Sequence, residues 1–110
     1  MMDKSKKYLS DILIAIELIE DFTIDITDFN SYENDLKTQS AVERQLAIIG
    51  EALNKLKKND DSIEITHAKH IISFRNRIVH AYDNIDNSIV WAILNRHLNK
   101  LKSEIINLTK

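Results

Sequence analysis

The 110 residues of the chain include no proline and one glycine, so residues that end helices or form tight turns are almost absent. Proline and glycine are the residues least compatible with a helix interior, whereas the abundant leucine, isoleucine, alanine, glutamate and lysine are compatible with it. A hydrophobic content of 44% is enough for one core of modest size. We therefore expect a single all-α domain that spans residues 1–110.

Apolar residues recur at spacings of three and four in four segments, which predicts four helices. The expected helices cover residues 5–22, 35–57, 66–81 and a last segment from about residue 87 to residue 108. Asp86 is expected to cap the last helix, which should run without a break. A single helical turn is expected near Phe29 to Tyr32, inside an acidic loop. Short connections between these helices favour an up-and-down four-helix bundle.

Two positions within the predicted helices suggest close neighbours. Ile14 and Leu18 form a second apolar strip on the first helix, opposite its main apolar face, so this helix is expected to contact two neighbours or another subunit. Gly50 lies inside the second predicted helix, where glycine costs about 1 kcal/mol relative to alanine. Because glycine lets two backbones approach closely, we expect a neighbouring helix to pack against Gly50. A functional role for this glycine is the alternative.

The charges are segregated along the chain. The net charge of −2 argues against a protein that coats nucleic acid through bulk electrostatics. Between Tyr8 and Leu36 there is no lysine or arginine, and the carboxylates there are Asp11, Glu17, Glu20, Asp21, Asp25, Asp28, Glu33 and Asp35. Between Ile65 and Tyr82 there are basic residues and histidines and no acid. A local anion site is therefore possible, and the acidic segment could dock a basic partner surface.

The chain has no cysteine, which excludes disulfides and thiolate metal sites and fits a reducing cytoplasm. No apolar run approaches the roughly 18 residues that a membrane span needs, so no membrane association is expected. His67 and His70 are three residues apart, but no third ligand accompanies them, and no metal site is predicted. His97 lies near the apolar stripe of the last helix and is expected to be structural.

The segment RNRIVHAY, Arg75 to Tyr82, places basic and polar residues inside an otherwise apolar helix. On an ideal helix Arg75 falls within the apolar sector, where an unpaired charge would cost several kcal/mol. Arg75 therefore needs a partner, either a carboxylate such as Glu43 or Glu51, or an anionic ligand. Arg75 and His80 are about 140° apart around the helix. They can converge on one ligand only if the helix loosens before His80, or if two copies meet across a symmetric interface.

Arg75, four residues, His80, one residue and Tyr82 form the pattern R-x4-H-x-Y, which resembles the motif of HEPN-domain proteins, specifically the HepT-type ribonuclease toxins. The segments AIIGEALNKL, FRNRIVHAYDNID and IVWAIL resemble the helices that surround this motif. The resemblance covers essentially the whole chain. It implies a metal-independent endoribonuclease without a cofactor, which works in the cytoplasm as a homodimer with both motifs in one cleft. It also implies tRNA or mRNA as substrate and a nucleotidyltransferase-type antitoxin as partner.

The resemblance implies a role for each residue of the motif. Arg75 and His80 would be catalytic, and Asn76 matches the polar residue that follows the motif arginine. Tyr82 would accept AMP from the antitoxin, and it could also stack on a base or position the phosphate. Histidine can donate or accept a proton at neutral pH, and the arginine fork matches two phosphate oxygens. Two copies of His80 could share the base and acid roles. Arg77 is either a solvated surface residue or an extra phosphate contact.

Two other functions fit the same residues. The chain could be a non-catalytic partner subunit of a nucleotidyltransferase, in which Arg75 and His80 bind a nucleotide or another anion without cleaving RNA. It could also be a purely structural subunit, in which Arg75 is a core charge paired with a carboxylate.

Overall fold

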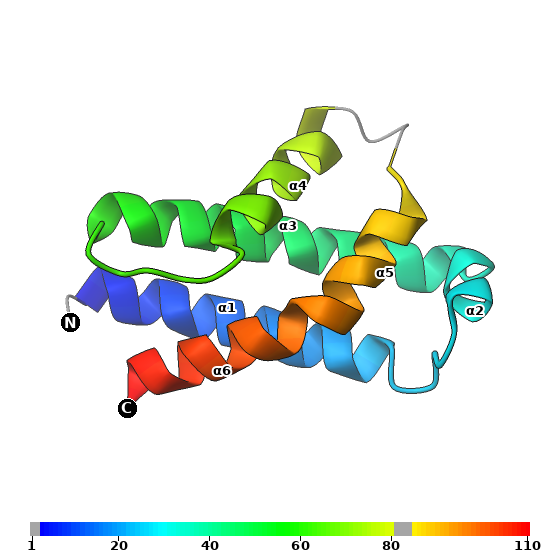
Figure 1. The fold of residues 1–110 in the computed structure, drawn as a ribbon, viewed down its shortest axis with the longest axis horizontal. Helices are drawn as coiled ribbons and strands as arrows, with labels where there is room; N and C mark the ends of the chain where they lie inside the picture. The colour runs from blue at the N-terminus through cyan, green and yellow to red at the C-terminus, as the bar shows by residue number, and fades with distance from the viewer. Residues whose placement is uncertain (1–2, 81–84) are drawn as a thin grey trace.

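The computed structural model describes residues 3–80 and 85–110, apart from the side chains of residues 3 and 77–80. Six helices make up this part of the chain, and no strand occurs in it. In chain order they are α1 (Asp3–Phe22), α2 (Phe29–Glu33), α3 (Leu36–Asn59), α4 (Ala68–His80), α5 (Asn87–Arg96) and α6 (Leu98–Thr109) (Figure 1). The prediction of an all-α helical bundle is confirmed.

The two longest helices, α1 and α3, lie side by side and run in opposite directions (Figure 1). Their facing sides carry the apolar residues that the sequence repeats at spacings of three and four. The fully buried or nearly buried members are Leu9, Ile12, Ile16, Ile19, Val42, Leu46, Ile49, Leu53 and Leu56. Burial of an aliphatic side chain of this size contributes roughly 1.5–3 kcal/mol. This α1–α3 seam is therefore the main stabilising contact of the fold.

Two buried polar side chains fix how the helices are placed. Ser5 of α1 is fully buried, and its Oγ accepts a hydrogen bond of 2.8 Å from the Nδ2 of Asn59, at the end of α3. Gln39 of α3 donates hydrogen bonds of 2.9 Å to the carbonyl oxygens of Tyr32 and Glu33, at the end of α2. A buried polar group without a partner is costly, so these bonds favour one placement of the helices over others.

Aspartates cap three helices at their N-termini. The Oδ1 atom of Asp28 accepts from Ser31 N at 2.7 Å and begins α2, which confirms the helical turn expected near Phe29. Asp35 begins α3 by accepting from Thr38 N at 3.0 Å and from Thr38 Oγ1 at 2.6 Å. Asp86 caps α5 as predicted, accepting from Ser88 N at 2.8 Å.

The prediction of one continuous last helix is wrong, because the chain bends at His97 between α5 and α6. Helical hydrogen bonding is kept across the bend, since His97 N donates to Ile93 O and Leu101 N to His97 O, both at 3.0 Å. The bend lets α5 pack on α2 while α6 packs on α1. Where α5 packs on α2, the ring centroids of Trp91 and Tyr32 are 5.7 Å apart. The apolar spacing continues through the bend, so the bend leaves no trace in the pattern of apolar residues.

The third predicted helix begins at Ala68 rather than at Thr66, because His67 has a positive φ of 68° and lies outside the helix. Within the described ranges, every helix is too short or too polar to cross a membrane.

Candidate active site

Helix α4 crosses α3 directly over Gly50, the one glycine of the chain. A Cβ atom on Gly50 would lie 2.5 Å from the Cβ of Arg75 and 3.1 Å from the carbonyl oxygen of Ile71. Such contacts are too short for any residue larger than glycine, so the predicted close approach of a neighbouring helix is confirmed. Ile71 and Phe74, both buried, hold the same side of α4 against the core. Gly50 therefore determines where the backbone of Arg75 lies.

The side chain of Arg75 is partly exposed and borders a cavity of about 490 Å³. The other residues around this cavity all come from α3 and are Ser40, Glu43, Arg44, Ala47, Ile48 and Glu51. Arg75 Nη1 donates a hydrogen bond of 3.2 Å to the Oδ1 atom of Asn76, the next residue. The guanidinium group thus reaches a solvent-accessible space, and its neighbour in sequence helps to orient it.

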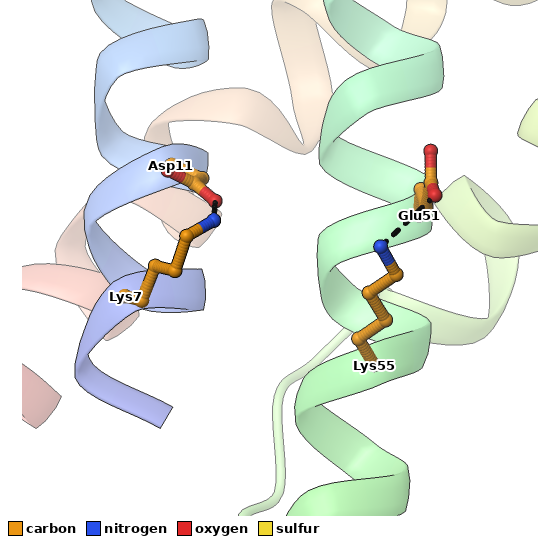
Figure 2. Close-up of polar contacts among 4 residues, drawn as sticks. All are labelled: Lys7, Asp11, Glu51 and Lys55. Carbon is orange, nitrogen blue, oxygen red and sulfur yellow. Dashed lines mark hydrogen bonds and ion pairs between the residues drawn. The ribbon is translucent and has the colours of Figure 1, made fainter. Parts of the chain in front are cut away.

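Neither of the two carboxylates expected as partners of Arg75 forms an ion pair with it. Glu51 Oε1 lies 3.1 Å from the Nζ of Lys55, one turn further along α3, as Lys7 pairs with Asp11 on the neighbouring α1 (Figure 2). The pKa of Glu43 is raised by burial. Among the residues that the structure describes, no salt bridge includes Arg75. A guanidinium keeps its charge at any physiological pH, so Arg75 presents a positive charge at this cavity without an ion pair to any described carboxylate.

Of the other motif residues, only Asn76 has a side chain within the described part of the structure. Asn76 is exposed next to Arg75. Arg77 and His80 belong to α4, but their side chains lie outside the described part of the structure, and Tyr82 lies outside the described residues altogether. The convergence of Arg75 and His80 around one phosphodiester therefore stays a prediction.

A second group of titratable side chains, which the sequence did not predict, lies at the other end of α4. The ring centroids of His67 and His97 are 4.1 Å apart, and His70 lies 5.9 Å from the first ring and 6.1 Å from the second. In the described ranges, no three histidine, cysteine or acidic residues are arranged so that they could hold a metal ion. Local spacing reveals only the pair His67 and His70, because His97 is brought in by the bend between α5 and α6.

The pKa of His97 is lowered, first by burial and then by the nearby His67, His70 and Arg96. Its Nδ1 atom is buried and has no hydrogen-bond partner in the described part of the chain. His97 was expected to be structural, and its position at the bend agrees with that expectation. Its ring also lies close to two other imidazoles.

Comparison with known proteins identifies the family. The family model described as "Ribonuclease HepT-like" matches residues 12–108, which include the whole segment from Arg75 to Tyr82. A protein of Thermococcus cleftensis named "Probable ribonuclease HepT" is 37% identical over 112 residues, covering 100% of both chains. A protein of Methanocaldococcus jannaschii named "Putative RNase MJ1380" is 34% identical over 102 residues, covering 91% of this chain and 92% of the relative. No solved structure matches the chain.

These matches extend over nearly all of the chain and confirm the resemblance first seen around the R-x4-H-x-Y motif and the prediction of a ribonuclease. The chain belongs to the HepT-like ribonuclease family.

Proposed function

We propose that the chain is a metal-independent endoribonuclease toxin, in which two copies bring Arg75 and His80 together at one RNA phosphodiester. The observation that carries this proposal is the position of Arg75 at a cavity of about 490 Å³, where it forms no ion pair with any described carboxylate, within the segment that the ribonuclease family model matches. A phosphate diester is an anion whose two non-bridging oxygens fit the planar donor fork of arginine.

The reaction requires two proton transfers and no metal ion. A neutral His80 removes the proton of the 2′-hydroxyl, and the 2′-oxygen attacks phosphorus. The bond between phosphorus and the 5′-oxygen breaks, and a protonated His80 of the second copy gives its proton to that oxygen. Arg75 stabilises the charge of the pentacoordinate phosphate during these steps. The products are a 2′,3′-cyclic phosphate and a free 5′-hydroxyl, so atoms and charges balance.

A homodimer is part of this proposal. Arg75 and His80 are about 140° apart around an ideal helix, and two copies related by a symmetry axis can bring the missing group from the partner. The outer strip of α1 supports such an assembly. Ile14, Leu18 and Phe22 are four residues apart and are 54%, 36% and 39% exposed. A continuous apolar strip of this kind is unusual on a surface that faces only water.

We further propose that a nucleotidyltransferase antitoxin inactivates the chain in the cytoplasm by transferring AMP to Tyr82. A bulky anion at the motif would exclude RNA by size and by repulsion. The acidic segment could help the antitoxin to dock, although Asp11, Glu20, Asp28 and Asp35 already interact within the chain. The carboxylates that remain for docking are therefore fewer than the sequence suggests.

Cleavage of tRNA in excess EDTA tests the central proposal. The purified wild-type chain should cut tRNA, and His80→Ala should abolish the cut without changing the oligomeric state. Lys100→Ala, which alters an exposed lysine of α6 far along the chain from the motif, is the matched control and should cut normally. Cleavage that needs added Mg²⁺ or that survives in His80→Ala would contradict the proposal. Nucleotide or phosphate binding without any cleavage would favour the non-catalytic partner subunit.

Intact mass spectrometry after co-expression with the proposed nucleotidyltransferase antitoxin tests the modification. The mass should rise by one or more AMP units, and Tyr82→Phe should prevent the increase. Suppressed activity with an unchanged mass would show instead that the antitoxin inhibits by binding alone.

A further inference from the structure

The first turn of α4 meets the bend between α5 and α6 through imidazole rings. Three of the four histidines of the chain are gathered there. His67 comes from the connector before α4, His70 from the first turn of α4, and His97 from the residue at which the chain bends. The closest pair, His67 and His97, has ring centroids only 4.1 Å apart. This histidine cluster therefore connects segments that are distant in the sequence.

The contact between the start of α4 and α5 includes a cavity. Helix α4 packs chiefly on α3, and a cavity of about 390 Å³ lies between α4 and α5. His70 and Phe74 of α4 border this cavity on one side, Ile89 and Ile93 of α5 border it on the other, and His97 lies at its edge. The one hydrogen bond described between the connector and α6 runs from Thr66 N to Glu104 Oε2, at 3.0 Å. The histidine cluster is thus the direct side-chain contact between the start of α4 and the bend.

The charges around the cluster are mostly positive. Lys69 of α4 and Arg96 of α5 are exposed close to it in sequence, and Arg96 lies near enough to His97 to disfavour its protonation. On α6, Glu104 Oε2 accepts from Thr66 N, and Glu104 Oε1 is buried without a hydrogen-bond partner among the described residues. Within the described residues, no carboxylate forms a hydrogen bond or ion pair with any of the three rings. Added protons on these rings would therefore repel one another and the nearby cations.

We propose that the histidine cluster is a proton-sensitive latch on α4. When its rings are neutral they pack the first turn of α4 against the bend between α5 and α6. When two or more are protonated they repel, and the first turn of α4 separates from the bend. The cavity between α4 and α5 gives solvent protons access to the rings and gives α4 room to move.

The direction of the pH effect follows from the lowered pKa of His97. The unfolded chain takes up a proton as the pH falls through the ordinary histidine value of 6.5, whereas the folded chain resists protonation at that pH. Stability from this contact is therefore complete above pH 6.5 and is lost as the pH falls below it. Arg75 lies on the same helix, five residues after His70. Release of α4 would loosen the contact between Arg75 and Gly50, a consequence that matters only if the proposed function is correct.

Thermal unfolding of the full chain in EDTA at pH 7.5 and pH 5.0 tests the latch. The wild type should lose roughly 5 °C or more between these conditions. The double variant His70→Gln/His97→Asn should lose clearly less, because neither substituted side chain can be protonated. His80→Gln removes the histidine outside the cluster and is the matched control, which should remain as acid-sensitive as the wild type. Equal losses in the wild type and the double variant would overturn the proposal.

Two measurements on the wild type keep the test decisive if the double variant does not fold. Amide hydrogen exchange, corrected for its intrinsic pH dependence, should show protection lost at pH 5.0 in α4 and kept in α3. In an NMR titration the ring of His97 should take up its proton below the ordinary histidine pKa of 6.5, because burial and the nearby imidazoles disfavour the charged form. Protonation of His97 at the ordinary value with unchanged protection of α4 would overturn the proposal, and so would stabilisation by added Zn²⁺, which would make the cluster a metal site. None of these readouts depends on RNA cleavage.

Discussion

Helix α3 is held in different ways on its two sides. Towards α1 it forms a seam of buried aliphatic side chains that both helices supply. Towards α4 it offers the bare backbone of Gly50, with the charged Arg75 above it and a cavity of about 490 Å³ alongside. The contact with α1 contributes stability through many buried aliphatic side chains, each of which adds a similar amount. The second side places one side chain accurately, so small changes there should affect activity more than folding.

The largest effect is expected from Arg75→Ala. Loss of the guanidinium should reduce RNA cleavage by about 100-fold or more, the usual cost of removing a group that stabilises the transition state. Because Arg75 forms no salt bridge with any described residue, the free energy of unfolding should change by less than about 1 kcal/mol. Arg75→Lys should recover only part of the activity, since lysine keeps the charge without the fork. Initial rates on tRNA and urea unfolding measure both quantities.

A strong loss of stability in Arg75→Ala, with activity intact, would reverse the comparison. It would make Arg75 a structural charge and support the purely structural subunit.

On the other side of α3, Leu46→Ala should destabilise the fold by about 3 kcal/mol, because it leaves a cavity in a fully buried seam. The activity of the molecules that remain folded should be close to that of the wild type. Urea unfolding followed by circular dichroism gives the first value, and rates measured well below the unfolding transition give the second. A loss of activity as large as that of Arg75→Ala, at full folding, would show that the two sides are not separable.

Gly50→Ala tests the contact between α3 and α4 itself. The added Cβ would lie 2.5 Å from the Cβ of Arg75, which cannot swing away as the end of a long side chain can. Overpacking of this kind costs about 1–3 kcal/mol, and the better helix propensity of alanine returns about 1 kcal/mol. We expect a modest net loss of stability and a clear loss of activity. Asn54→Ala, one turn further along α3, is the matched control, and a more stable Gly50→Ala would disprove the close approach.

The smallest effect is expected from the N-cap of α3, which belongs neither to the contact with α1 nor to the contact with α4. Hydrogen bonds from Thr38, first from its side chain and then from its backbone, lower the pKa of Asp35 below 3.8. The capping contribution is therefore present above that pH and is lost as the pH falls through the lower value of the folded state. Asp35→Ala should be less stable than the wild type at pH 7, and the two unfolding midpoints should converge in acid. Persistence of the difference in acid would mean that the charge of Asp35 is not responsible.

The sequence predicted those features that depend on a few consecutive turns of the chain. The spacing of apolar residues from Val42 to Leu56 identified α3, and Asp86 was recognised as the cap of α5. Gly50 indicates a neighbouring helix, because glycine destabilises a helix interior and is expected there only where another backbone approaches closely. These successes share one cause: the information lies within the element itself.

Features that depend on distant neighbours could not be predicted. The bend at His97 reflects the packing of α5 on α2 and of α6 on α1, while the apolar spacing runs through it unchanged. The meeting of His97 with His67 depends on that bend. The sequence required a partner for Arg75 but could not choose between a carboxylate and a ligand, and the structure removes the carboxylate from this choice for the described residues. The relation of Arg75 to His80 stays a prediction.

The hydrogen bond between Ser5 and Asn59 has a consequence for the whole seam. Aliphatic side chains at regular spacing could mesh equally well if α1 slid along α3 by one turn, about 5.4 Å. Such a slide would leave the buried hydroxyl of Ser5 without its hydrogen-bond partner. One modest polar pair at the end of the two longest helices thus acts as a stop that selects a single alignment.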